Sequence, residues 1–98
     1  MKNFFKQYDI EMPELYEQEN EENPVAHAHF IAGEWEWFVT EASERDGDLL
    51  LFGLVNGDEK ELGYFTLMQL ASVGAGLDID FEPVGVFDIY EDFDLRRR

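Results

Sequence analysis

Two histidines separated by one residue, His27 and His29, are the first side chains in this sequence that could do chemistry. If residues 25–32 form a strand, both imidazoles lie on one face of it, because strand side chains alternate. Glu36, on the next predicted strand, would add a carboxylate, and this ligand set suits zinc with one open position. The alternative is a pair of half-exposed histidines on an acidic sheet face. No cysteine is present, so thiolate metal sites and disulfides are excluded.

The acidic residues in and around the stretch LVNGDEKELGYF, residues 54–65, form the second candidate group. A calcium loop needs oxygen ligands at alternate positions, Gly at the sixth and Glu at the twelfth, and these residues do not follow that spacing. Two carboxylates can act as general acid and base when their surroundings separate their pKa values. Turn formation, which Asn-Gly and Asp-Gly favour, is the remaining alternative. The residues considered are Asp46, Asp48, Asp58, Glu59 and Glu61 for calcium, and Glu41, Glu59 and Glu61 for a carboxylate pair.

No nucleophile accompanies these groups, since the sequence offers no thiol, no Ser–His–Asp arrangement and no Gly-rich phosphate loop. We therefore assign no catalytic residue and no cofactor, and we expect a protein that is not an enzyme. A small metal-binding protein or hydrolase-like enzyme that uses His27, His29 and nearby carboxylates is the alternative. A structural domain that dimerises through an exposed aromatic or an edge strand is a third possibility.

The formal net charge of −16, from 23 acidic and seven basic residues, narrows the choice of partner. Nucleic acid and anionic membrane both require a basic surface, so neither is expected as a direct partner. Solubility needs a net charge of only about 2–8 in a small domain. The excess acidity therefore points to a basic protein as the partner.

Two segments, residues 9–22 and 78–94, each hold seven acidic residues and no basic one. A compact chain of this length is about 30 Å across, and a DNA duplex of that length carries about 18 phosphate charges. We expect a non-enzymatic acidic protein-binding module and, in the sharpest form, a nucleic-acid mimic that occupies the cationic groove of a nucleic-acid-binding protein. An ordinary acidic surface is the alternative. The expected partner contacts are Glu14, Glu17, Glu21, Glu22, Asp78, Asp80 and Glu82.

The two chain ends carry further expectations. The first residues, MKNFFKQYDI, lack the apolar stretch of a secretory signal peptide, and no apolar run approaches the roughly 20 residues that span a bilayer. We therefore expect a cytoplasmic protein. Arg96–Arg98 form either a solvated tail or a tail that folds back onto the acidic segment.

Several segments have the patterns of β-strands. Residues 49–55, LLLFGLV, form the continuous apolar run of a strand buried on both faces. In the first hairpin, pairing of even with odd positions brings two apolar sets together. These sets are Ala26, Ala28 and Phe30 on one strand and Trp35, Trp37 and Val39 on the other. The strands are expected at 25–32, 35–41, 49–55 and 61–65, with an edge strand at 77–81.

Two helices are predicted beside these strands. Thr66 followed by Gln69 forms a capping box that begins a helix over about 67–73, and Gly74 ends it. Pro13 suits a first helical turn, so PELYEQENE, residues 13–21, is predicted as a helix. The fold class is therefore α+β: a small antiparallel β-meander of three to four strands packed with one capped helix and a peripheral acidic helix. The single domain, 1–98, has its core at about 25–82, an acidic arm at 1–24 and an acidic segment at 83–98.

The aromatic residues have two interpretations. In a basic groove they would form a platform for stacked bases, but the acidic composition favours core packing. The residues in question are Trp35, Trp37, Phe38, Phe52, Tyr64 and Phe65. Anchors for the two ends are expected at Phe4, Phe5, Tyr8 and Ile10, and at Phe87, Ile89, Tyr90 and Phe93.

The sequence WEWFVTE, residues 35–41, and the run FGLVNGDEKELGYFTL, residues 52–67, carry a specific resemblance. They resemble an uncharacterised family of small proteins from plasmids, phages and other mobile elements, with the motifs W-x-W-[YF]-V-T-E and F-G-x-V-x-G-x-E-x-E-L-G-Y-F-[ST]-L. The likeness covers about 25–82 and implies a meander-plus-helix domain and a mobile-element home, without a mechanism. Where members tend to have I-E-R-D, this chain has IDFE at 79–82. The matching motif residues are Trp35, Trp37, Thr40, Glu41, Phe52, Gly53, Glu59, Glu61, Gly63, Tyr64 and Phe65.

Overall fold

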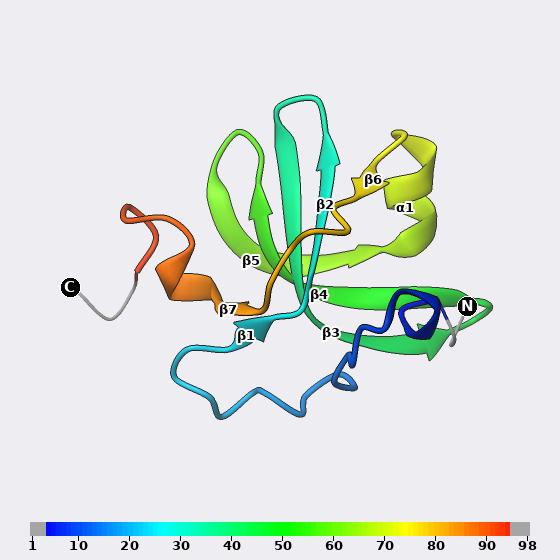
Figure 1. Cartoon of the computed structure of the whole chain (residues 1–98), viewed down its shortest axis with the longest axis horizontal. Helices are drawn as coiled ribbons and strands as arrows, with labels where there is room; N and C mark the ends of the chain where they lie inside the picture. The colour runs from blue at the N-terminus through cyan, green and yellow to red at the C-terminus, as the bar shows by residue number, and fades with distance from the viewer. Residues whose placement is uncertain (1–3, 95–98) are drawn as a thin grey trace.

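The centre of the molecule, in a computed structural model that describes residues 4–94, is an antiparallel sheet of five strands in the order β5-β4-β3-β2-β6 (Figure 1). A separate two-stranded sheet pairs β1 with β7. The strands are β1 (Val25–Ala26), β2 (Ala28–Ala32), β3 (Trp35–Arg45), β4 (Asp48–Asn56), β5 (Lys60–Thr66), β6 (Gly76–Leu77) and β7 (Val84–Gly85). The helices are α1 (Leu67–Ser72) and two short 3-10 helices, η1 (Lys6–Tyr8) and η2 (Val86–Asp88).

The predicted antiparallel meander is confirmed, but the sheet has more strands and less helix than expected. Two strand boundaries changed: β3 continues to Arg45, and the edge strand predicted at 77–81 is only the pair Gly76–Leu77 beside β2. The capping box at Thr66 is confirmed, because its side chain accepts from the Gln69 N–H and the Gln69 side chain accepts from the Thr66 N–H. Gly74, with a φ of 70°, follows this helix as predicted. No helix formed by residues 4–94 is long and apolar enough to cross a membrane.

The acidic helix predicted over 13–21 is wrong. Residues 15–20 form turns instead, and Tyr16 has a φ of 75°, which no α-helical residue adopts. The Leu15 side chain is buried, and the Pro13 carbonyl accepts a hydrogen bond from the Ala42 N–H of β3. A backbone hydrogen bond to β3 therefore takes the place of a hydrogen bond that a helix would make within the segment.

The first hairpin has the predicted register, with one exception. Ala28 lies opposite Val39 and Phe30 opposite Trp37, so even positions pair with odd ones. Ala26, however, packs with the cluster on the other face, not with Ala28. The strand pattern is interrupted between β1 and β2 at His27, whose N–H donates to the Val39 carbonyl. The facing strand, β3, has a register shift between Val39 and Glu41. The single strand predicted at 25–32 is therefore two strands.

Two apolar clusters form the core, and each chain end covers one of them. Phe5 and its neighbours in the N-terminal arm pack against Phe30, Leu51 and Leu70. The C-terminal segment packs Phe87 and Phe93 against Phe38 and Leu54 on the other face. In Figure 1 the N-terminal segment runs below the sheet and the C-terminal segment lies at its left. The predicted anchors Phe4, Phe5, Ile10, Phe87, Ile89, Tyr90 and Phe93 all belong to these clusters, whereas Tyr8 is exposed and contacts the Phe4 ring.

Candidate functional site

The Val-Thr-Glu part of the first motif forms a β-bulge with a buried carboxylate. At the register shift, the Thr40 hydroxyl donates to the Phe52 carbonyl at 3.0 Å. Glu41 is only 5% exposed, and its carboxylate accepts from the Tyr16 N–H at 2.9 Å and the Gln18 N–H at 2.7 Å. The backbone of the 15–20 turn thus supplies the donors that a buried carboxylate needs.

Gln18 and Ser43 extend this attachment. The Gln18 amide donates to the carbonyls of Val25 and Thr40, both at 2.9 Å, and accepts from the Val25 N–H at 2.8 Å. The Ser43 hydroxyl accepts from the Leu15 N–H at 2.9 Å and donates to the Glu14 carboxylate at 2.9 Å. Glu41 therefore holds the N-terminal segment on the sheet, and both of its oxygens accept hydrogen bonds from that segment.

Two motif glycines are explained by close packing. A Cβ on Gly53 would lie 1.8 Å from the Phe38 carbonyl oxygen, and one on Gly57 would lie 2.1 Å from the Trp35 ring. Gly53 therefore needs a residue without a side chain because the neighbouring atoms are backbone, whereas a side chain at Gly57 would displace the Trp35 ring. The Trp35 ring thus packs against the Asn-Gly turn, in agreement with the interpretation of this stretch as a hairpin turn.

His29 lies between two carboxylates. Its Nε2 is 2.8 Å from Glu36 Oε2, its Nδ1 is 3.0 Å from Asp78 Oδ2, and its ring stacks on Phe38 with centroids 4.3 Å apart. Only the protonated ring can donate to both carboxylates at once. This contact ties the segment after β6 to the middle of the sheet, and both ring nitrogens are already engaged.

The zinc hypothesis finds no support in the part of the chain that the structure describes. Residues 4–94 contain no group of three His, Asp or Glu side chains that could hold a metal ion. His27 lies at the interruption between β1 and β2 and lines two surface hollows, one of which Asp78 also lines. Burial lowers the pKa of His27, and the nearby Glu11 carboxylate partly opposes this shift.

Glu36 belongs to a wider polar network. Its Oε1 accepts from the Asn56 amide at 3.1 Å and from the Tyr90 hydroxyl. Burial alone would raise the pKa of Glu36, but the hydrogen bonds from Tyr90, Asn56 and His29 lower it overall. The hydrogen bond from His29 also lowers the pKa of Asp78. Burial, followed by the bond to Glu36, raises the pKa of Tyr90 to about 12.

The predicted partner contacts are mostly available at the surface. Six of the seven carboxylates are exposed, and Asp78 is the exception because it is half-buried against His29. The six are Glu14, Glu17, Glu21, Glu22, Asp80 and Glu82. Glu14 and Glu17 are also bonded to each other, since the Glu17 carboxylate accepts from the Glu14 N–H.

An acidic groove of about 640 Å³ lies between the N-terminal segment and the β3–β4 hairpin. Its floor includes Phe5 and Leu49, and four carboxylates line it, from Glu11, Glu14, Glu17 and Glu44. Glu11 and Glu44 were not among the predicted partner contacts. Glu44 reaches the groove because β3 extends past the predicted strand end.

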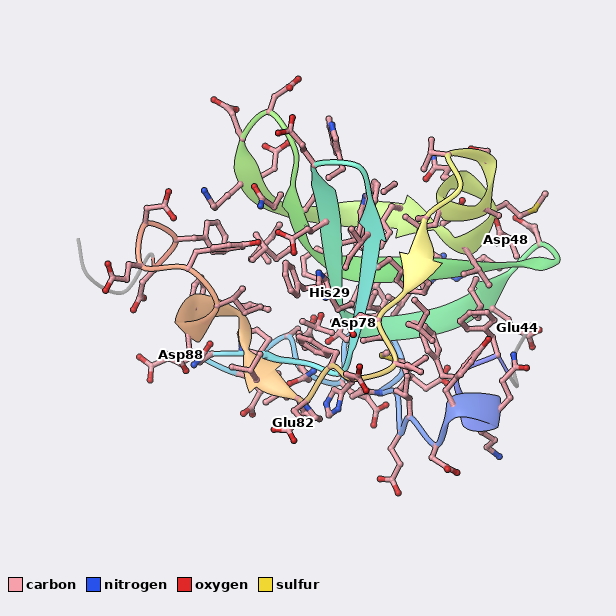
Figure 2. All side chains as sticks on the ribbon, turned by 45° about the horizontal axis from the view of Figure 1, so that its top comes forward. His29, Glu44, Asp48, Asp78, Glu82 and Asp88 are labelled. Atoms are coloured by element: carbon pink, nitrogen blue, oxygen red, sulfur yellow. The ribbon has the colours of Figure 1, made fainter. Side chains whose placement is uncertain are left out.

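A second hollow, of about 480 Å³, shares Glu11 and His27 with this groove and reaches Asp9 and Asp78. The two acidic segments therefore meet here, although they are far apart in the sequence. The residues that follow the first segment also contact the second, since β1 pairs with β7 and the Asn23 amide donates to the Asp88 carboxylate at 2.9 Å. Carboxylates also lie elsewhere: Figure 2 shows Asp88 at one end of the molecule and Glu44 and Asp48 at the other.

Several of the remaining motif residues are not explained by packing, although Phe65 is buried in the core. Asp58, Glu59 and Glu61 are all exposed, so they lack the contrasting surroundings that an acid–base pair of carboxylates requires. Tyr64 is 53% exposed. A Cβ on Gly63 would meet no atom within 4 Å.

Comparison with known proteins places the chain in a family. No curated protein and no solved structure matches it. The sequence model of a family described as "Protein of unknown function (DUF2958)" matches residues 4–92. This match includes the N-terminal segment that Glu41 holds and most of the C-terminal segment, as well as the sheet. The chain therefore belongs to the DUF2958 family of proteins of unknown function.

Proposed function

We propose that this protein is a non-enzymatic acidic module that binds a basic surface of another protein. The observation that carries the proposal is the hollow in which the two acidic segments, 9–22 and 78–94, meet, together with the connected groove that four carboxylates line. Segments that were separate in the sequence thereby supply carboxylates to one region of the surface. That region includes Asp9, Glu11, Glu14 and Glu17 from the first segment and Asp78 from the second.

The balance of charge supports a cationic partner. All 23 acidic residues lie within the described part of the chain, which has only three basic side chains of Lys or Arg, at Lys6, Arg45 and Lys60. Among these three, Lys60 makes an ion pair, with Asp92 at 3.0 Å. Most of the carboxylate charge is therefore uncompensated within residues 4–94, and a basic partner would neutralise it.

The sharper form of the proposal is nucleic-acid mimicry. The longest dimension of the molecule is 39 Å, and a DNA duplex of that length carries about 23 phosphate charges. A chain with a net charge of −16 can thus compete for the cationic groove of a nucleic-acid-binding protein. The resemblance to proteins of mobile elements makes a restriction or CRISPR component of the host the partner of choice.

Capture from a host lysate at low and high salt tests this function. The variant Glu17→Gln/Glu21→Gln/Glu22→Gln removes three exposed charges from the first acidic segment, and Glu34→Gln/Asp46→Asn/Asp58→Asn removes three from the hairpin turns. We expect capture of a basic protein that is lost at high salt, that the first variant weakens and that the second leaves intact. Salt-independent capture, a partner without a basic surface or equal loss in both variants would overturn the proposal.

A further inference from the structure

Strand β5 has one side that pairs with nothing in the described part of the chain. It is the first strand in the sheet order and pairs only with β4. Residues 61–65 make no other backbone hydrogen bond to residues 4–94. Because the bonds of an antiparallel strand alternate in direction, half of its N–H and C=O groups point away from β4. A seven-residue edge of this kind is a template for another strand.

The middle of this edge is open. Gly63 is the central residue of β5, and a Cβ there would meet no atom within 4 Å. A glycine inside a strand marks a place where another chain can approach closely. The space beside Gly63 can accept a side chain from an added strand, between Glu61 and Phe65 on the same face.

An aromatic platform lies on the other face of the edge. Tyr64 is 53% exposed, contacts the Phe52 ring at 4.8 Å and is hydrogen-bonded to the side chain of Tyr16. Tyr16 is 51% exposed although its φ of 75° is unfavourable for a bulky residue. The bond from its N–H to the buried Glu41 holds this conformation. The fold thus maintains a strained backbone at a residue whose ring remains exposed, which is typical of binding sites.

The charges beside the edge are mostly negative. Asp58, Glu59 and Glu61 are exposed, and the Lys60 ammonium is already paired with Asp92. Arg45 is the one basic residue near the platform among residues 4–94, and its charge partly opposes the rise in the pKa of Tyr64. A second copy of the chain would bring another charge of −16 to this edge, so a basic occupant is favoured.

We propose that β5 binds an extended segment of a partner protein, in which basic and apolar residues alternate, as a sixth strand of the sheet. Its basic side chains lie beside Glu59 and Glu61, and its apolar side chains lie on Tyr64 and Tyr16. Main-chain hydrogen bonds supply affinity, and the two faces supply specificity. This inference rests on the proposed function in one respect, namely that the partner is basic.

The test uses the full chain and an octapeptide of alternating Lys and Val, with an alternating Glu and Val peptide as its control. We expect only the Lys-Val peptide to slow hydrogen exchange at the β5 amides. Tyr64→Ala should weaken its binding roughly tenfold, the size of one binding hot spot. Ile79→Ala, which truncates a 77% exposed side chain near the opposite edge, is the matched control and should have no effect. Glu61→Lys should reverse the preference, so that the Glu-Val peptide binds better.

Three outcomes would overturn the inference. Protection of residues 9–22 in place of β5 would show that the peptide binds the acidic groove, which leaves the proposed function standing. Protection of β5 without peptide, in a dimer seen by sedimentation, would assign the edge to a second copy. Binding of neither peptide would show that the charges at β5 only prevent edge-to-edge aggregation, while the lysate capture still tests the proposed function.

Discussion

The bulge in β3 and the edge strand β5 both contain residues of the same sequence motifs, but their surroundings are opposite. At the bulge, Glu41 is buried and bonded to two backbone N–H groups, whereas Glu61 on β5 is exposed. Gly53 and Gly63 lie directly opposite each other in the β4–β5 pair, yet a Cβ would clash at the first and meet open space at the second. The motifs therefore combine residues that build the fold with residues that the fold leaves available.

Alanine substitutions of the two glutamates, Glu41 and Glu61, should give the largest difference in the free energy of unfolding. Glu41→Ala leaves the N–H groups of Tyr16 and Gln18 without their charged acceptor, so we expect a loss of about 4 kcal/mol in the free energy of unfolding. Glu61→Ala should change it by less than about 0.5 kcal/mol. Urea denaturation of both variants measures these values. If Glu41→Ala fails to fold, Glu41→Gln replaces it in the same measurement. Similar losses in the two alanine variants would break the comparison.

Alanine substitutions of the two glycines, Gly53 and Gly63, should give a smaller difference in the free energy of unfolding. Gly53→Ala places a methyl group against the backbone of β3, so we expect a loss of about 2–3 kcal/mol. Gly63→Ala meets open space and restricts the unfolded chain, so stability should be unchanged or rise by about 0.5 kcal/mol. Thermal unfolding of the two variants makes this test. Destabilisation by Gly63→Ala as large as that of Gly53→Ala would show that the edge is tightly packed.

Two tyrosines extend the comparison to alkaline pH. The folded-state pKa of Tyr90 is about 12, above its unfolded value of about 10, so its contribution is complete below pH 10 and is lost as the pH rises toward 12. We expect a loss of about 1 kcal/mol in this window, after allowance for solvent screening, that Tyr90→Phe abolishes. The hydrogen bond with Tyr16 also raises the pKa of Tyr64, but this residue is exposed, so Tyr64→Phe should leave the pH dependence of stability intact. Urea denaturation at pH 9 and pH 11.5 distinguishes the two; an unchanged alkaline slope in Tyr90→Phe would contradict the network.

The sequence predicted the features that depend on neighbouring residues. The alternation in the first hairpin, the apolar run of β4 and the Thr66–Gln69 capping box all appear as expected. The helix at 13–21 failed because Glu41, more than 20 residues away, bonds its backbone. A glutamate within the otherwise apolar β3 was the available signal, since a buried carboxylate must find donors somewhere.

The site was less predictable than the fold. The sequence placed His29 on one face with Glu36, and the structure agrees, but the second carboxylate, Asp78, comes from 49 residues away. The acidic segments were recognisable from composition, whereas their meeting in the second hollow depends on long-range contacts, and the nearby β1–β7 pair is too short to leave a periodic pattern. The free edge of β5 is a property of sheet order, and sheet order follows from long-range pairing that local patterns do not contain.

The β1–β7 pair also has a kinetic consequence. Val25 and Gly85 are partners across 60 positions of chain, so this contact closes a longer loop than any other strand pair within residues 4–94 and adds to the contact order. The first acidic segment ends just before β1 and the second contains β7, so their mutual repulsion opposes closure more strongly at low ionic strength. We therefore expect closure of this pair to be a late folding step that added salt accelerates. In the native state the same pair should open ahead of the main sheet, while Glu41 keeps the first acidic segment bonded to β3.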